Sequence, residues 1–329
     1  MTSGRPPVPT RPLLVWIALV TVYLVWGSTY LGIRVVVETT PPLLGMGARF
    51  LAAGLLLATF LLVRRGKRAL AVTGRQLRGA ALVGLLLLLG GNGGVALAER
   101  TVPSGVTALL VAATPLWLVL LRRAAGDRVR RMTLVGTGLG FVGIALLVLP
   151  DGHSSGDGTP VHVWGLLVVI CAAASWAVGS FASSRVAMPA DAFVATTWEM
   201  LAGGVGLMLA GTAHGELRGF AVSDVAGEAW AWLAYLVVFG SLVAFSAYVW
   251  LLQHAPISLT ATYAYVNPVV AVGLGALVLD EPVTAAVLVG GAVVVAGVCL
   301  VVSSERPRRQ LPPTTEPVGD GGTVVDLRA

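Results

Sequence analysis

The chain has 329 residues, of which 56% are hydrophobic and only 12% are charged. A soluble domain carries roughly 25% charged residues, so this composition excludes an ordinary soluble protein and indicates a membrane protein. The net charge of +6 would suit nucleic-acid binding in a soluble protein, but the positions of the basic residues indicate another role.

Apolar runs long enough to span a bilayer recur along the whole chain. A helix needs about 20 apolar residues to cross roughly 30 Å of hydrocarbon. We predict ten such helices, near 14–36, 43–63, 77–98, 103–121, 132–149, 163–184, 193–211, 229–252, 258–279 and 283–302. The runs are continuous rather than alternating, which excludes a transmembrane barrel. The predicted fold class is therefore an all-α integral membrane protein with ten transmembrane helices.

The basic residues gather on one side of these predicted helices. With the N-terminus in the cytoplasm, all but four of the 22 Lys and Arg residues lie in cytoplasmic segments. The exceptions are Arg34, Arg49, Arg100 and Arg218. The external loops carry Asp151, Asp157, Glu216, Asp224, Glu228, Asp280 and Glu281. Positive charge marks the cytoplasmic side of membrane proteins, so both termini are predicted to be cytoplasmic and nucleic-acid binding is not expected.

The chain also repeats itself internally. At a constant spacing, Pro103 aligns with Pro256 and Pro115 with Pro268, so the first five helices correspond to the last five. Five is odd, so the two halves enter the membrane from opposite sides, as in the inverted repeats of secondary transporters. The predicted parts are a cytoplasmic tail (1–12), a first repeat (13–150), an external linker (151–162), a second repeat (163–303) and a disordered cytoplasmic tail (304–329).

Four stretches of sequence resemble those of a known family. They are "VYLVWGSTYLGIRVV", "GARFLAAGLLL", "ERTVPSGVTALLVAATPLW" and "TYAYVNPVVAVGLGALVLDEPV". The chain resembles the EamA-type permeases of the drug/metabolite transporter superfamily over about 13–303. The resemblance implies ten helices around a central cavity, with the fifth and tenth helices peripheral, and export of small metabolites or toxic analogues across a bacterial inner membrane.

Two prolines interrupt predicted helices at corresponding places in the two halves. A proline leaves the carbonyl four residues earlier unpaired, which affects Val111 before Pro115 and Ala264 before Pro268. Paired interruptions of this kind indicate a transport site in the middle of the membrane. The alternative is that each proline only bends a helix for packing.

The polar and aromatic residues near these interruptions are the candidate substrate-binding residues. They are Trp26, Ser28, Thr29, Tyr30, Asn92, Thr114, Ser180, Trp198, Tyr263, Tyr265 and Asn267. Tyrosine and tryptophan combine an apolar ring with a polar group. The hydroxyl residues have an alternative role, because Ser and Thr in membrane helices often bond to their own backbone or join helices. The tryptophans could equally lie at the membrane interfaces.

Two charged residues, Arg49 and Glu199, lie well inside predicted helices. An isolated charge near the bilayer centre costs about 3 kcal/mol, so both should face the interior of the bundle. Their depths make a direct ion pair possible only with extended side chains. Glu199 is a candidate proton carrier or, alternatively, a fixed hydrogen-bonding centre. Arg49 suits a substrate carboxylate or phosphate.

These features predict a secondary exporter of small metabolites, such as amino acids or drugs, that works by alternating access. The expected partners are a small-molecule substrate, the lipid bilayer and, as a further hypothesis, protons. We expect no catalytic residues, metal or cofactor, and Cys171 and Cys299 should be buried inside helices. The alternatives are a membrane sensor that binds substrate without transport and a lipid-modifying membrane enzyme.

Overall fold

The computed structural model describes residues 12–127, 129–148, 163–255, 257–260 and 262–304, and it contains no strand over these ranges. The first half comprises α1 (Pro12–Thr39), α2 (Pro42–Arg65), α3 (Gly74–Gly84), the π-helix η1 (Leu85–Gly93), α4 (Gly94–Ala98), α5 (Ser104–Val111), α6 (Thr114–Ala124) and α7 (Arg131–Val148). The second half comprises α8 (Val163–Ser183), α9 (Ala192–Ala213), the short 3₁₀ turn η3 (Val222–Asp224), α10 (Gly227–Tyr235), the π-helix η4 (Leu236–Phe245), α11 (Ser246–His254), α12 (Ile257–Thr260), α13 (Tyr263–Val278) and α14 (Ala285–Ser304).

The predicted all-helical class is confirmed. Eight continuous helical stretches are long and apolar enough to cross a membrane. Two further apolar helices, Arg131–Leu147 and Val266–Val278, are shorter, so the predicted count of ten spanning helices stays a prediction. The predicted linker 151–162 and the tails 1–11 and 305–329 lie outside the described residues.

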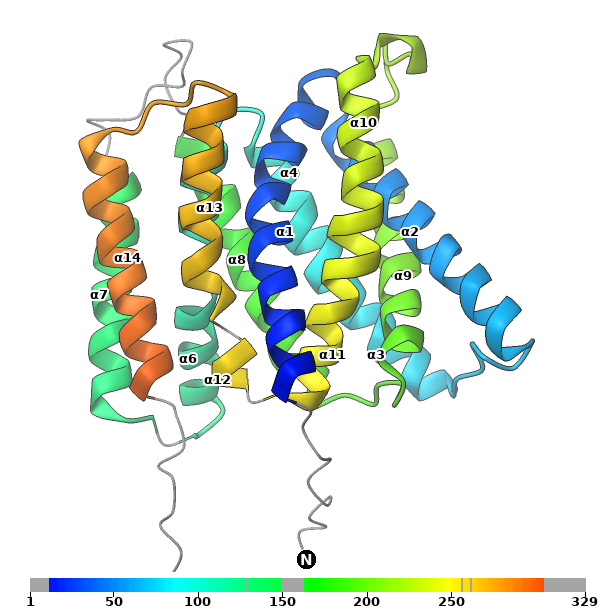
Figure 1. Ribbon diagram of the computed structural model, residues 1–329, viewed down its shortest axis with the longest axis horizontal. Coiled ribbons are helices and arrows are strands. Elements are labelled where there is room, and N and C mark those ends of the chain that lie inside the picture. The colour runs from blue at the N-terminus through cyan, green and yellow to red at the C-terminus, as the bar shows by residue number, and fades with distance from the viewer. Residues whose placement is uncertain (1–11, 128, 149–162, 256, 261, 305–329) are drawn as a thin grey trace, which may run out of the picture.

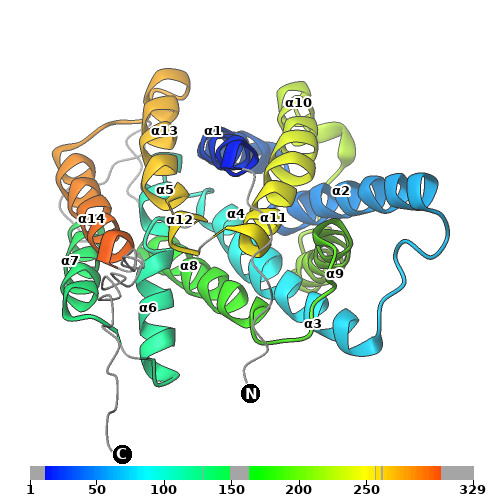
Figure 2. The ribbon, with the colours of Figure 1, turned by 60° about the horizontal axis from the view of Figure 1, so that its bottom comes forward.

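The helices form one upright bundle (Figures 1 and 2). α7 and α14 pack together at one edge, and α2 packs on α9 at the other. Between them, α1 packs on α13, η4 and α11, while α8 packs on η1, α4 and α6. α1 begins and α14 ends at the lower end of the bundle in Figure 1, which we call the terminus end; the other is the opposite end.

Small residues let the helix backbones approach each other closely. A Cβ atom added to Gly297 on α14 would lie 2.5 Å from the main-chain nitrogen of Gly140 on α7, and one added to Gly143 would lie 2.6 Å from that of Val294. Association of helices in a membrane depends on this kind of tight packing because lipid tails are as apolar as the helices. The glycines therefore fix the peripheral pair α7–α14.

The outer surface of the bundle is apolar, as expected of a surface that contacts lipid. Large side chains including those of Leu13, Trp16, Phe60 and Leu277 are more than half exposed. Cys171 and Cys299 are also exposed and free, so the prediction that both are buried was wrong. Each cysteine lies on the side of its helix that faces away from the bundle. The sequence places both cysteines in helices, but it does not show which side of the helix each one is on.

The two prolines differ in their effect on the chain. The helix of the fourth apolar run breaks between α5 and α6, just before Pro115. Thr114 is the first residue of α6 after this break, and its hydroxyl donates to the Val111 carbonyl at 2.7 Å. Pro268 instead lies inside α13, and the helix is interrupted earlier, between α12 and α13.

Candidate functional site

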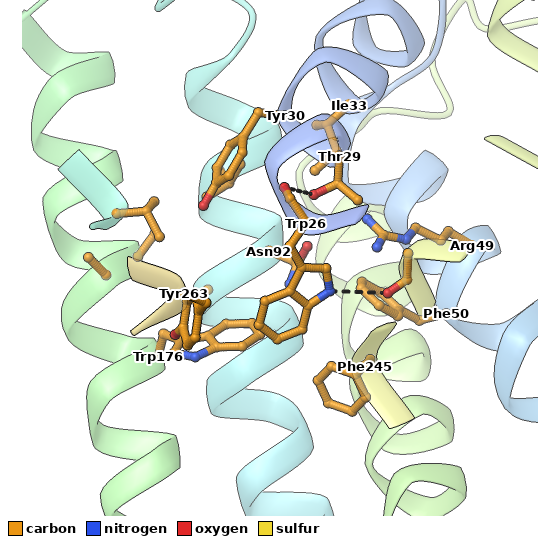
Figure 3. Close-up of a pocket in the computed structure, with 16 residues that line it drawn as sticks. Trp26, Thr29, Tyr30, Ile33, Arg49, Phe50, Asn92, Trp176, Phe245 and Tyr263 are labelled. Carbon is orange, nitrogen blue, oxygen red and sulfur yellow. Dashed lines mark hydrogen bonds between the residues drawn. The ribbon is translucent and has the colours of Figure 1, made fainter. Parts of the chain in front are cut away.

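A cavity lies in the middle of the bundle, between the two halves of the chain (Figure 3). The first half supplies Trp26, Thr29, Tyr30, Ile33, Arg49, Phe50, Gly91, Asn92, Val95 and Val111, and the second half supplies Ala172, Ala173, Trp176, Gly240, Phe245 and Tyr263. The cavity has a volume of about 60 Å³, measured as the space open to the centre of a water molecule. A water molecule needs roughly 10–15 Å³ by this measure, so the cavity holds a few waters in this conformation.

Aromatic rings form the floor of this cavity on the side of the terminus end. The ring of Trp26 meets that of Trp176 edge to face at 5.6 Å and that of Tyr263 at 5.4 Å. Tyr248 lies beneath them, with its ring 4.9 Å from that of Trp26. The Trp26 indole N–H donates to the Gly240 carbonyl at 3.2 Å, which fixes its orientation. Such edge-to-face rings bind flat or apolar groups by area and by quadrupole interactions.

Both π-helices contribute residues to the wall of this cavity. η1 contributes Gly91 and Asn92, and η4 contributes Gly240 and Phe245. A π-helix shifts the side chains that follow it around the helix axis and frequently occurs at functional sites. Both segments lie in the middle of a long spanning helix, so the widening falls at cavity depth in both halves.

Arg49 on α2 provides the positive charge of the cavity. Its side chain is only 3% exposed, its Nε donates to the Ser241 hydroxyl at 2.9 Å, and its guanidinium carbon lies 4.6 Å from the ring centre of Phe50. None of the ion pairs formed by the described residues involves Arg49. The guanidinium therefore retains donors for an anionic group that enters the cavity.

Glu199 on α9 lies in a different place, at a second and larger cavity of about 660 Å³ toward the terminus end. Its side chain is 2% exposed, and Oε2 has no hydrogen-bond partner among the described residues. Ser184 and Ala190 on the rim of this cavity are exposed, so it reaches the surface. The ion pair between Arg49 and Glu199, which the sequence left open, is not among the ion pairs of the described residues.

Ser180 separates the two cavities. Its hydroxyl donates to the Trp176 carbonyl at 2.9 Å and lies 3.2 Å from the Tyr248 hydroxyl. Tyr248, Ser180 and Thr114 also line a small pocket with Pro115, next to the aromatic floor. The layer between the cavities is therefore one helical turn of α8 thick.

Of the predicted binding residues, the structure brings together Trp26, Thr29, Tyr30, Asn92, Tyr263 and Arg49. Thr114 and Ser180 line the small neighbouring pocket instead. Three others lie elsewhere. The Ser28 hydroxyl contacts that of Tyr235 at 2.6 Å, and the Trp198 indole donates to the Leu70 carbonyl at 3.2 Å. With its amide nitrogen turned toward them, Asn267 donates to the main-chain carbonyls of Tyr263 and Tyr23, at 3.2 and 3.1 Å. The side chain of Tyr265 lies outside the described part.

Ser28, Trp198 and Asn267 contact other parts of the protein in this conformation, and their role in substrate binding stays a prediction. Ser28 and Asn267 connect α1 to its neighbours α10 and α13, and Trp198 packs outside the bundle centre against Leu57 and Leu61. Each side chain is satisfied by a protein group and none of the three lines the central cavity.

The sequence reasoning missed the partner aromatics and one carboxylate. Trp176 lies in "SWAVGS", the segment that aligns with "VWGSTY", so its correspondence with Trp26 was a usable signal. Phe50, Phe245 and Tyr248 gave no signal in so apolar a chain. Glu99 follows α4 directly and was missed, yet it is completely buried.

The cavity, its surrounding spanning helices and its apolar exterior define a polytopic membrane protein built around a central cavity. The sequence profile of the EamA-like transporter family matches residues 13–149 and again 163–303. The chain therefore belongs to the EamA-like transporter family, as the resemblance predicted.

Known relatives agree with this assignment. The "Uncharacterized inner membrane transporter YedA" of Escherichia coli K12 is 43% identical over 78% of this chain and 80% of its own length. The "Uncharacterized transporter YvbV" of Bacillus subtilis is 25% identical over 89% of this chain and 93% of its own. A crystal structure with 20% sequence identity covers 89% of this chain and 98% of its own at a TM-score of 0.62, which shows a shared fold. These names are those of transporters rather than enzymes.

Proposed function

We propose that the protein is a secondary transporter that exports small organic molecules from the bacterial cytoplasm by alternating access. The observation that carries this proposal is the central cavity, with Arg49 and an aromatic floor, separated by one turn of α8 from a larger cavity that reaches the terminus end. A site that only a thin layer separates from one side of the membrane supports alternating access, in which the same site opens in turn to each side.

The orientation and the duplication are parts of the same proposal. Cytoplasmic termini follow from the distribution of arginines and make the larger cavity an opening to the cytoplasm. Two inverted repeats of five helices are supported by the two separate profile matches and by corresponding contacts, since α2 packs on α9 and α7 on α14. In this arrangement the layer at Ser180 is what separates the central cavity from the cytoplasmic opening in the conformation described here.

The chemistry of the cavity favours a substrate that combines an anionic group with an apolar or aromatic part. Arg49 receives the anionic group, and Trp26, Trp176 and Tyr263 contact the rest. Amino acids and related compounds fit this description. The space of about 60 Å³ means that the cavity walls must separate when substrate binds.

Proton coupling is proposed for Glu199. It is a buried carboxylate at the cavity that leads to the terminus end, where a proton can exchange with water. If coupling uses this residue, Glu199→Gln abolishes the acceleration of transport by a pH gradient. Unchanged dependence on the gradient in Glu199→Gln would exclude this role.

The test of the function is uptake of labelled amino acids and nucleobases into inside-out vesicles, with and without a pH gradient. Arg49→Gln should reduce uptake of anionic and zwitterionic compounds on the order of tenfold, because one buried charged hydrogen bond is worth about 1.5–3 kcal/mol. Arg64→Gln, on the exposed end of the same helix, is the matched control and should transport normally. Binding without flux of any compound would favour the sensor alternative.

A further inference from the structure

Glu99 is buried at the opposite end of the bundle without the partners that a charged carboxylate needs. Its side chain is 0% exposed, and neither carboxylate oxygen has a hydrogen-bond partner among the described residues. Its hydrogen bonds are made by the main chain: the carbonyl accepts from the Arg34 guanidinium, and the N–H donates to the Val95 carbonyl at 2.9 Å. An ionised carboxylate in this state is costly, whereas a protonated one loses much less on burial.

The loop that follows Glu99 leads to the start of α5, where the Glu281 carboxylate binds the first main-chain N–H groups of the helix. After one turn the chain enters α5, and the main-chain N–H groups of Ser104 and Gly105 donate to the Glu281 carboxylate at 2.8 and 3.1 Å. The Ser104 hydroxyl donates to it at 3.0 Å. Glu281 follows α13, so these bonds hold the second half of the chain against the first at this end. We call this contact the Glu281 latch.

The charged groups around Glu99 come from three elements. The side chains that interact with it electrostatically are those of Tyr30 and Arg34 on α1, Arg49 on α2 and Glu281 in the latch. Arg34 is also paired with Glu38 at 3.7 Å, and Arg49 is bound to Ser241, so neither arginine donates to the Glu99 carboxylate. Burial raises the pKa of Glu99 well above its ordinary value and repulsion from Glu281 raises it further, while Arg34 and Arg49 lower it.

We propose that Glu99 is a proton-binding site that controls the opening of the opposite end: this end closes with the Glu99 carboxyl protonated and opens when the proton leaves. The inference rests on the alternating access proposed above, with this end facing the cell exterior. On opening, the Glu281 latch separates and water reaches Glu99, which then releases its proton to that water. Because the closed state binds the extra proton, acidic external pH favours closure and alkaline pH favours opening.

The test measures how fast a membrane-impermeant thiol reagent in the medium reaches the central cavity of the protein in right-side-out vesicles, where the opposite end faces the medium. Ile33→Cys places the thiol in the cavity, in a chain that also carries Cys171→Ala and Cys299→Ala. Reaction rates are compared with those of the same chain carrying Glu99→Gln, which mimics the protonated carboxyl and cancels the intrinsic effect of pH on the thiol. The ratio of the two rates should rise on the order of tenfold from mildly acidic to mildly alkaline pH, and Glu99→Asp should retain the rise.

Two carboxylates at the same end serve as comparisons. Glu281→Gln weakens the latch and should raise labelling at every pH. The Glu216 carboxylate likewise accepts hydrogen bonds from the main-chain N–H groups of Leu43 and Leu44 at the start of α2. Glu216→Gln is therefore the matched control and should leave the pH dependence intact.

A ratio that does not change with pH, or labelling that Glu281→Gln does not raise, would overturn the proposal. Transport by the same variants is measured as uptake into inside-out vesicles to separate the two hypotheses. Intact transport with a flat ratio rejects the role of Glu99 alone. A pH-dependent ratio without transport of any compound rejects the proposed substrates but supports Glu99 as the proton-binding site.

Discussion

Gly84 lies where α3 crosses α9, directly against the main chain of Glu199. A Cβ atom added there would lie 2.3 Å from the Glu199 carbonyl oxygen and 2.7 Å from its Cα. Backbone cannot move aside as a flexible side chain can, so Gly84→Ala should destabilise the protein by about 1–3 kcal/mol. Thermal unfolding in detergent measures this loss. Gly138→Ala, a helical position with nothing within 4 Å, should unfold at the wild-type temperature.

Single residues also show why the site was only partly predictable. Ser28 and Thr29 are neighbours, yet Thr29 lines the cavity and Ser28 faces Tyr235. Consecutive residues of a helix point about 100° apart, since one turn takes 3.6 residues. Sequence composition identified the correct helices, but the apolar character all around them left the rotation of each helix undetermined. The same uncertainty explains why Trp198 was assigned to the site and faces away.

At the scale of elements, the break before Pro115 depends on one hydroxyl. Pro115 has no N–H to donate, so the Thr114 hydroxyl is what satisfies the Val111 carbonyl. Thr114→Val keeps the shape and removes the donor, and should cost about 1 kcal/mol of stability. Thr114→Ser retains the hydroxyl and should behave as wild type. Equal unfolding temperatures for the Val and Ser variants would contradict this role.

The start of α9 gives a prediction about pH. The Asp191 carboxylate accepts from the main-chain nitrogens of Phe193 and Val194 and from Arg65 at 2.6 Å. Partial burial raises the pKa of Asp191, but the bonds from Arg65 and the backbone lower it more, so the net pKa is below its ordinary value. The carboxylate therefore stabilises the fold above the pKa of the unfolded chain, and this contribution is lost as pH falls through the lower pKa of the folded state.

Asp191→Ala should thus lower stability by about 0.5–2 kcal/mol at neutral pH, the usual value of a helix cap, and by less in acid. Asp191→Asn keeps the cap without the charge and should lose less. Thermal unfolding of the three proteins at neutral and acidic pH measures the difference. A difference between wild type and Asp191→Ala that grows in acid would show that the sign is wrong.

Elements were the level at which prediction from sequence worked best. Nearly every predicted span coincides with helix, because continuous apolar length is a strong signal. The π-helices η1 and η4 were not predicted, since no residue pattern distinguishes them from α-helix in a run such as "LLLLLGGNG". Pro268 was expected to interrupt its helix and does not, because the break falls before Tyr263.

At the scale of the whole molecule, closing the opposite end permanently should stop transport. A Cβ atom on Gly275 would lie 3.0 Å from the Ser104 hydroxyl oxygen, close to the separation that a disulfide needs, and it would displace the Glu281 carboxylate, so that the cross-link takes the place of the latch. The double variant Ser104→Cys/Gly275→Cys, without the two native cysteines, should lose transport on oxidation and regain it on reduction. Transport by each single variant should not change on oxidation or on reduction. Full transport by the oxidised, cross-linked protein would exclude movement at this end.

The edge-to-face contact between Trp26 and Trp176 also gives the protein a natural optical reporter. Indole emission responds to the polarity and the neighbours of the ring, and both rings belong to the wall that must separate when the cavity fills. A compound that occupies the cavity should therefore change the intrinsic fluorescence of the unmodified protein. Screening for that change needs no label and no vesicle, and it can begin while the substrate is still unidentified.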